Sequence, residues 1–157
     1  MDEARIEIDA PAEVVYDLVA DVTNMGRWSP ETYRTEWVGE RREPVVGAKF
    51  KGWNRTKVKG VPATWWTTSI VRRADRGRAF SFDTPFSGAR WTYRFEPAGD
   101  GCVVTETREE VRSPLAVKGL YAVVGGIRRR QLADGMEVTL RRLKEAAETA
   151  TDPTPAA

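Results

Sequence analysis

The sequence contains no histidine and only one cysteine among its 157 residues. Without histidine, neither a serine-histidine-aspartate triad nor a cysteine-histidine pair can form, and histidine-ligated metal sites are excluded. The one cysteine, Cys102, has no partner for a disulfide within the chain, and no neighbour in the sequence would activate its thiol. We therefore predict neither a metal nor a cofactor, and we expect any chemistry to rest on carboxylates, tyrosine, asparagine and arginine.

The chain also lacks long apolar runs. No stretch approaches the roughly 18 consecutive apolar residues that a membrane-spanning helix needs. The N-terminal residues contain no apolar segment of the kind found in secretory signals, and cysteine is rare. We therefore expect a cytoplasmic protein without a membrane span.

Neither charge sign is in clear excess. The 25 lysines and arginines nearly balance the 23 aspartates and glutamates, for a formal net charge of +2. The densest basic run, Arg128 to Arg130, lies in a helical pattern that also carries Asp134 and Glu137. This mixture is typical of a solvated helix face, so we predict no nucleic-acid partner.

The chain is rich in aromatic residues, with six tryptophans, five phenylalanines and four tyrosines. The clearest pattern is Trp91, Tyr93 and Phe95, which alternate with polar residues as in a strand with one buried face. With turn signals such as Gly99-Asp100-Gly101, the pattern predicts a run of about six antiparallel strands. We place these strands at residues 32–39, 47–55, 64–72, 79–83, 90–95 and 102–111.

Before this run, isoleucines alternate with charged residues over 4–9, which predicts another short strand. Pro11 then suits the first turn of a helix, whose apolar face ends near Gly26. One or two short helices are therefore expected after the first strand. Strands followed by a terminal helix indicate an α+β fold with a curved antiparallel sheet of six or seven strands.

The C-terminal part of the chain is helical in pattern. Ser113-Pro114 predicts a helix start, and Gly125-Gly126 predicts a break or kink. Residues 127–148 then predict a helix roughly 33 Å long, enough to cross a whole sheet. We expect one domain over 1–148 and a disordered tail over 149–157.

Several segments carry a resemblance to a known family. The chain resembles the polyketide cyclase/dehydrase group of the START-like (SRPBCC) superfamily. Within that group it resembles members of an actinobacterial type. The resemblance covers about residues 4–148 and implies a helix-grip fold, in which the sheet wraps around the C-terminal helix. It also implies a deep cavity between sheet and helix where apolar small molecules bind. The segments that carry it are 8–31, 47–55, 66–71, 79–82, 91–97, 101–107 and 135–144.

Most candidate ligand-binding residues are large side chains on the predicted strands. Aromatic rings can fill a solid core or form a cavity wall, and both interpretations stay open here. Trp65 and Trp66 are adjacent on one strand and must point to opposite faces. Asn54 would either orient a ligand carbonyl or bond the backbone at the strand end. The candidates are Tyr33, Trp37, Phe50, Asn54, Trp66, Phe80, Phe82, Trp91, Phe95, Tyr121 and Met136.

Glu106 is the main polar candidate. It shares a strand face with Val104 and Arg108, and Val104 is expected to point inward. A carboxyl group in an apolar cavity has a raised pKa and can act as a general acid or base. The candidate catalytic set is Glu106, Tyr93 and Arg108. The alternative is a structural ion pair between Glu106 and either Arg108 or Arg55.

Three functions remain open from the sequence. The first is a binder of a hydrophobic small molecule such as a lipid or a polyketide-like compound. The second is a cofactor-independent cyclase, aromatase or dehydratase that works by acid-base chemistry and confinement. The third is a protein-interaction module, for which no large exposed apolar patch is evident. We expect a monomer or homodimer with an apolar small-molecule ligand.

Overall fold

The computed structural model describes residues 1–111 and 115–151, with the side chains of residues 58, 115–125 and 128 left out of the description. Seven strands precede one long helix, with short helical segments after the first strand. In chain order the elements are β1 (Asp2–Ile8), α1 (Ala12–Ala20), the 3-10 turn η1 (Val22–Asn24), α2 (Met25–Trp28), β2 (Thr32–Val38), β3 (Lys49–Val58), β4 (Val61–Asp75), β5 (Ala79–Thr84), β6 (Ala89–Ala98), β7 (Gly101–Glu110) and α3 (Leu115–Thr151).

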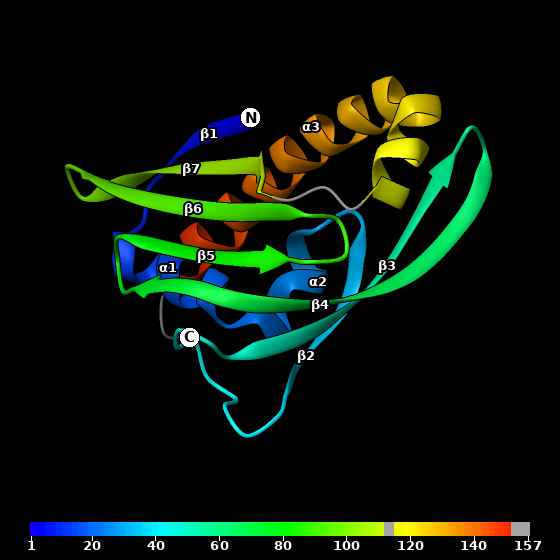
Figure 1. The fold of residues 1–157 in the computed structure, drawn as a ribbon. Helices are drawn as coiled ribbons and strands as arrows, with labels where there is room; N and C mark the ends of the chain where they lie inside the picture. The colour runs from blue at the N-terminus through cyan, green and yellow to red at the C-terminus, as the bar shows by residue number, and fades with distance from the viewer. Residues whose placement is uncertain (112–114, 152–157) are drawn as a thin grey trace, which may run out of the picture.

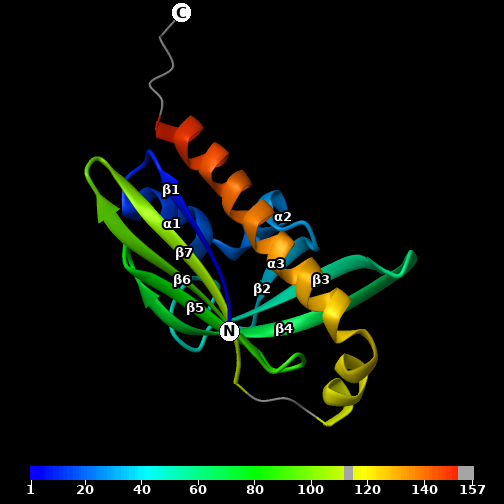
Figure 2. The ribbon, with the colours of Figure 1, turned by 90° about the horizontal axis from the view of Figure 1, so that it is seen from above.

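The strands form one antiparallel sheet in the order β1-β7-β6-β5-β4-β3-β2. Sequential strands are neighbours except at β1, which pairs with the last strand, β7. The sheet curves around α3, which crosses its concave side (Figures 1 and 2). The predicted α+β helix-grip fold is confirmed.

The core lies between the sheet, α1 and the C-terminal half of α3. Phe80 is fully buried, and the ring of Tyr16 on α1 meets the rings of Phe80 and Phe95 edge-on at 6.3 and 5.7 Å. The predicted apolar stripe of α3 is buried along its whole length, because one helix face packs on the sheet. Its members are Leu132, Met136, Leu140, Leu143 and Ala147.

Helix α3 is longer at its C-terminal end than predicted. It extends to Thr151, so residues 149–151 belong to the helix and not to the predicted tail. The hydroxyls of Thr149 and Thr151 donate to the carbonyls of Glu145 and Ala147, which carries the helix past its last buried residue. Residues 152–157 lie outside the described residues.

At its other end, α3 begins at Leu115, and the predicted start at Ser113-Pro114 lies outside the described residues. The helix runs through Gly125-Gly126 without ending there. Two glycines cost roughly 2 kcal/mol of helix propensity, which the long helix tolerates. The ribbon changes direction within its yellow N-terminal stretch (Figures 1 and 2).

Strands β3 and β4 form a long hairpin that projects beyond the rest of the sheet (Figure 1). The predicted Gly/Pro connection at 57–62 is shorter than expected, because Lys57 pairs with Pro62 and Val58 with Val61. Only Lys59 and Gly60 make the turn, at φ angles of 50° and 82°. Positive φ at both positions is typical of the type I′ turn that matches strand twist.

Replacing Lys59 with asparagine is expected to raise the free energy of unfolding by about 0.5–1 kcal/mol. Asparagine tolerates the left-handed backbone of this position better than lysine does. Chemical denaturation measures the change. The same substitution at Lys57, a strand position paired with Pro62, is the control and should not stabilise. Equal stabilisation by both variants would contradict the turn assignment.

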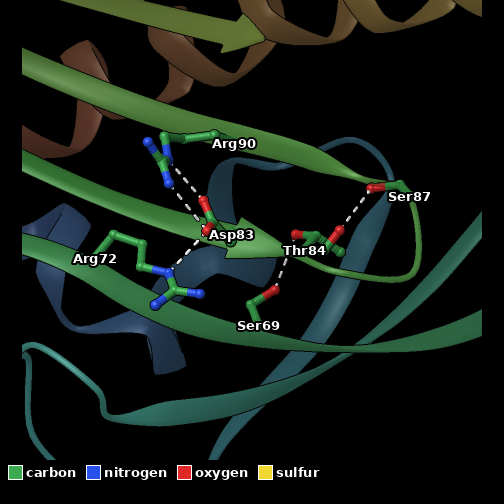
Figure 3. A network of polar contacts seen from close by, with 6 residues as sticks. All are labelled: Ser69, Arg72, Asp83, Thr84, Ser87 and Arg90. Atoms are coloured by element: carbon green, nitrogen blue, oxygen red, sulfur yellow. Dashed lines mark hydrogen bonds and ion pairs between the residues drawn. The ribbon is translucent and has the colours of Figure 1, made fainter. Parts of the chain in front are cut away.

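Polar contacts connect the middle strands on both sheet faces. Figure 3 shows Asp83 between Arg72 and Arg90, at 2.8 and 2.7 Å, so that one carboxylate bridges β4, β5 and β6. The hydrogen bond from Arg90 holds the pKa of Asp83 below its ordinary value. The next residue, Thr84, points to the concave side, where its hydroxyl lies 3.0 Å from that of Ser69.

Candidate functional site

A cavity of about 400 Å³ lies between the concave face of the sheet and α3. Five aromatic side chains contribute to its wall: Phe50, Trp65, Phe82, Trp91 and Tyr93. Among the described residues that line the cavity, side chains with a hydroxyl group are at least as frequent as aromatic ones. They come from Ser29, Thr32, Thr35, Thr56, Thr67, Ser69, Thr84, Ser87 and Thr139. The cavity therefore combines flat apolar surfaces with many hydrogen-bonding groups.

The structure brings seven of the predicted site residues together around this cavity. They are Phe50, Asn54, Phe82, Trp91, Tyr93, Glu106 and Arg108. The three acid-base candidates lie on the neighbouring strands β6 and β7, where Tyr93 pairs with Glu106 and Trp91 pairs with Arg108. The alternating pattern of β6 and β7 placed these side chains on the concave face.

Trp66 does not line the cavity, so its placement there is wrong. Its side chain lies on the convex face of β4 and is 61% exposed, whereas the adjacent Trp65 lines the cavity. Neighbouring strand residues alternate between faces, so only one of the two rings can face inward. Thr67 and Ser69 share the inward face with Trp65, and this run of small polar side chains is the signal that could have identified it.

On β2, Tyr33 and Trp37 are also displaced from the predicted site. The pairing of β2 with β3 shifts register between Thr32 and Arg34, which leaves Tyr33 as the extra residue of a bulge, 46% exposed. Trp37 is half-buried and meets the ring of Phe50 edge-on at 6.0 Å. It therefore packs beside Phe50 on the same face of the sheet and is not part of the cavity lining.

The remaining candidates are core residues or lie outside the description. Phe80 and Phe95 point to the concave side but are covered by Tyr16 of α1, which fills this end of the sheet. Met136 is buried on α3 and is also not part of the cavity lining. The side chain of Tyr121 lies outside the described residues.

Glu106 and Tyr93 form a buried hydrogen-bonded pair in the cavity wall. The Tyr93 hydroxyl donates to Glu106 Oε1 at 2.7 Å, and only 6% of Tyr93 and 2% of Glu106 are exposed. The second carboxyl oxygen, Glu106 Oε2, is buried without a hydrogen-bond partner among the described residues. A buried oxygen without a partner is unfavourable by about 1–3 kcal/mol, and a bound ligand could supply the missing contact.

Burial decides the protonation state of this pair. Loss of solvent raises the pKa of Glu106 from its ordinary 4.5 to about 8, although the hydrogen bond from Tyr93 acts in the opposite direction. Burial and the neighbouring Glu106 also raise the pKa of Tyr93 well above its ordinary value. Glu106 is therefore mostly a neutral acid at pH 7. Since Tyr93 donates to Oε1, the carboxyl proton is available on Oε2.

Arg108 lies one step further along the same face of β7 and does not pair with Glu106. Its guanidinium lies 3.5 Å from Asp2 Oδ2 and 5.9 Å from the centre of the Trp91 ring. Arg55 lies on the convex face over the ring of Tyr33. The structural ion pair considered for Glu106 therefore does not form with either arginine.

Asn54 is held in place by the protein itself. Its Oδ1 accepts from the Thr32 hydroxyl at 2.7 Å, and its Nδ2 donates to the Gly52 carbonyl at 3.3 Å and towards Thr67 Oγ1 at 3.4 Å. Backbone bonding was one of the two predicted roles of this amide. Its position in the cavity wall leaves the second role, orientation of a ligand carbonyl, as a prediction.

Helix α3 contributes residues that the sequence did not identify. Gln131 lines the cavity, and its Nε2 donates to the Lys57 carbonyl at 2.7 Å, which connects the helix to the tip of the β3–β4 hairpin. Its Oε1 is buried without a partner among the described residues. Val138 and Thr139 line the cavity about two turns further along. Nothing in the helical pattern separates these residues from an ordinary amphipathic face.

Cys102 is buried beside β1, and burial raises the pKa of its thiol, as expected for an unreactive cysteine. Among the described residues, no cluster of three or more histidine, cysteine, aspartate or glutamate side chains could hold a metal ion. A search of the same residues finds no helix that is long and apolar enough to span a membrane.

Comparison with known proteins gives one family. A model of the family described as polyketide cyclase / dehydrase and lipid transport matches residues 3–148. No curated protein matches the chain.

Solved structures share the fold over nearly the whole chain. A polyketide-cyclase-like protein of Corynebacterium glutamicum is 33% identical, with 96% of this chain and 92% of that chain covered and a TM-score of 0.62. The di-domain ARO/CYC BexL from the BE-7585A biosynthetic pathway is 26% identical, with 98% and 48% covered and a TM-score of 0.59. A protein of Thermus thermophilus, at 22% identity, 96% and 99% coverage and a TM-score of 0.65, supports the fold alone.

Proposed function

Because the chain belongs to the polyketide cyclase / dehydrase and lipid transport family, we propose that it binds a small molecule in the cavity beside Glu106. The ligand has a flat apolar body that packs between the aromatic walls. It also carries a carbonyl or hydroxyl oxygen that accepts a hydrogen bond from the neutral carboxyl of Glu106. The observation that carries this proposal is the buried Oε2 of Glu106, which has no partner among the described residues.

The composition of the wall supports this ligand class over a purely apolar one such as a saturated acyl chain. Hydroxyl groups of Thr67, Ser69 and Thr84 line the cavity, and the Asn54 amide lies among them. These groups already bond one another or the backbone, but Glu106 Oε2 and Gln131 Oε1 have no partner among the described residues, and an acyl chain offers them none. A ring system with several oxygens can bond to the unpartnered carboxyl and still fills the aromatic part of the wall.

Binding of Prodan, an uncharged fluorescent naphthalene ketone, is expected to weaken about tenfold as pH rises through about 8. Below this pH Glu106 donates to the ketone oxygen, and above it the carboxylate repels that oxygen. Fluorescence titration from pH 6 to pH 10 measures the affinity. Glu106→Gln keeps a donor at every pH and is expected to bind with an affinity that does not depend on pH.

Two outcomes would contradict this proposal. One is an affinity for Prodan that does not change with pH in the unmodified protein. The other is a pH dependence that persists in Glu106→Gln, since a different group would then be responsible. Native mass spectrometry of the purified protein adds an independent check, because a retained small molecule should be displaced by Prodan.

A second candidate function is dehydration or ring closure of such a ligand, with Glu106 as the proton donor. A carboxyl group with a pKa of about 8 is protonated at neutral pH and can give its proton to a departing hydroxyl, which leaves as water. The resulting carboxylate then takes a proton from the adjacent carbon, as the double bond forms. Likeness to an ARO/CYC protein at 26% identity favours this candidate. It requires that Glu106→Gln stops turnover while Prodan still binds.

A further inference from the structure

The convex face of strand β3 carries a regular row of basic side chains. Lys49, Lys51, Arg55 and Lys57 alternate with residues that line the cavity, such as Asn54. Because strand side chains alternate between faces, all four cations and Trp53 lie on the outer side. From Lys49 to Lys57 the row is roughly 26 Å long.

Two tryptophans lie within this row of cations. Trp53 pairs across the strands with Trp66, and the ammonium of Lys51 lies 4.9 and 4.6 Å from the centres of their rings. The guanidinium of Arg34, on β2, lies 4.5 Å from the centre of the Trp53 ring. We call the outward side chains of β2, β3 and the adjoining part of β4 the basic face, defined by Arg34, Lys49, Lys51, Trp53, Arg55, Lys57 and Trp66.

The basic face differs from the neighbouring convex surface in how its charges are matched. On β4–β6, Asp83 neutralises both Arg72 and Arg90 (Figure 3). On the basic face, the ion pair found among the described residues is that of Arg34 with Glu36. The other cations lie over aromatic rings or extend into solvent. This half of the sheet therefore carries a local positive charge that the net charge of +2 conceals.

We propose that the basic face docks on a bilayer surface rich in anionic phospholipid. Each lysine or arginine near such a surface contributes roughly fivefold to binding. Tryptophan is favoured at the level of the lipid headgroups, where its ring is partly buried and its N–H stays hydrated.

The arrangement of the rings favours a lipid surface over a single-stranded nucleic acid. Nucleic-acid platforms present free aromatic faces on which bases stack. Here the cations of the same face lie close to the rings of Trp53 and Trp66. The inner side of the same three strands lines the cavity. This point rests on the proposed function: docking holds the cavity on the far side of the same sheet, one sheet away from the bilayer in which a poorly soluble ligand dissolves.

Vesicle sedimentation tests the proposal with the full-length protein. We expect binding to phosphatidylcholine vesicles that contain phosphatidylglycerol, no binding to pure phosphatidylcholine, and loss of binding at high salt. The double variant Lys49→Glu/Arg55→Glu should bind at least about 25-fold more weakly, since two cations contribute roughly fivefold each. The control Arg78→Glu/Arg94→Glu changes the net charge equally at exposed positions elsewhere and should keep most of the binding.

Three results would overturn the proposal. These are binding that does not depend on phosphatidylglycerol, equal losses in the two double variants, and tighter binding of a single-stranded oligonucleotide than of the anionic vesicles. Prodan affinity without vesicles, measured on the same variants, separates this proposal from the proposed function. If Prodan binds normally and vesicles do not, only the docking proposal fails.

Discussion

Replacing Glu106 with glutamine is expected to stabilise the protein at alkaline pH, by roughly 4–5 kcal/mol at pH 9. Burial raises the pKa of Glu106 from 4.5 to about 8, so the folded state holds a proton that the unfolded chain releases. Between these two values stability falls as pH rises, and each pKa unit corresponds to roughly 1.4 kcal/mol. Below pH 4.5 the carboxyl is protonated in both states, and the penalty is absent.

Glutamine is a neutral group of nearly the same shape as the protonated acid, and its oxygen can still accept from Tyr93. The variant should therefore match the parent near pH 4 and exceed it increasingly up to pH 9. Chemical denaturation at a series of pH values measures the difference. Glu109→Gln, at an exposed position of the same strand, is the control and should leave the pH dependence unchanged. Parallel curves for the parent and Glu106→Gln would show that Glu106 is not held neutral.

Replacing Val138 with tryptophan is expected to weaken Prodan binding at least about 100-fold. Val138 projects from α3 into the cavity, and an indole there occupies space that the ligand's rings need. The loss corresponds to roughly 2.7 kcal/mol of binding free energy. The fold should tolerate the change, because the added ring enters an existing cavity and displaces no packed side chain.

The matched control for this variant is Glu137→Trp, which adds the same ring at the adjacent, exposed position of α3. It should bind Prodan as the parent does. Denaturation of both variants separates blocked binding from a general loss of structure. Unchanged affinity in a folded Val138→Trp variant would place the Prodan site outside this cavity.

The sequence could predict those site residues whose position depends on strand alternation alone. Tyr93 and Glu106 lie on regular strands, so their common face followed from a period of two. The prediction that Trp66 lines the cavity was wrong because two adjacent tryptophans give no signal for which one faces inward. The prediction for Tyr33 was wrong because the β2 bulge adds a residue that no local pattern indicates.

Tertiary packing explains the other differences. Phe80 and Phe95 are on the concave side, as their pattern suggested, but α1 covers that end of the sheet. Which part of a sheet a short helix covers depends on contacts distant in sequence. The same limit applies to Gln131, whose contact with Lys57 joins segments 74 residues apart. The fold was predictable because it needs only the order and period of the elements, whereas the cavity depends on how they pack.

The proposed function depends on a neutral Glu106 carboxyl as the hydrogen-bond donor of the cavity. NMR titration of isotope-labelled glutamate carboxyl groups tests it most directly, with the Glu106 signal assigned by its loss in Glu106→Gln. We predict a midpoint near pH 8 in the free protein. We also predict a higher midpoint with Prodan bound, since the ketone oxygen favours the protonated acid. A Glu106 midpoint near 4.5, unchanged by Prodan, would contradict it.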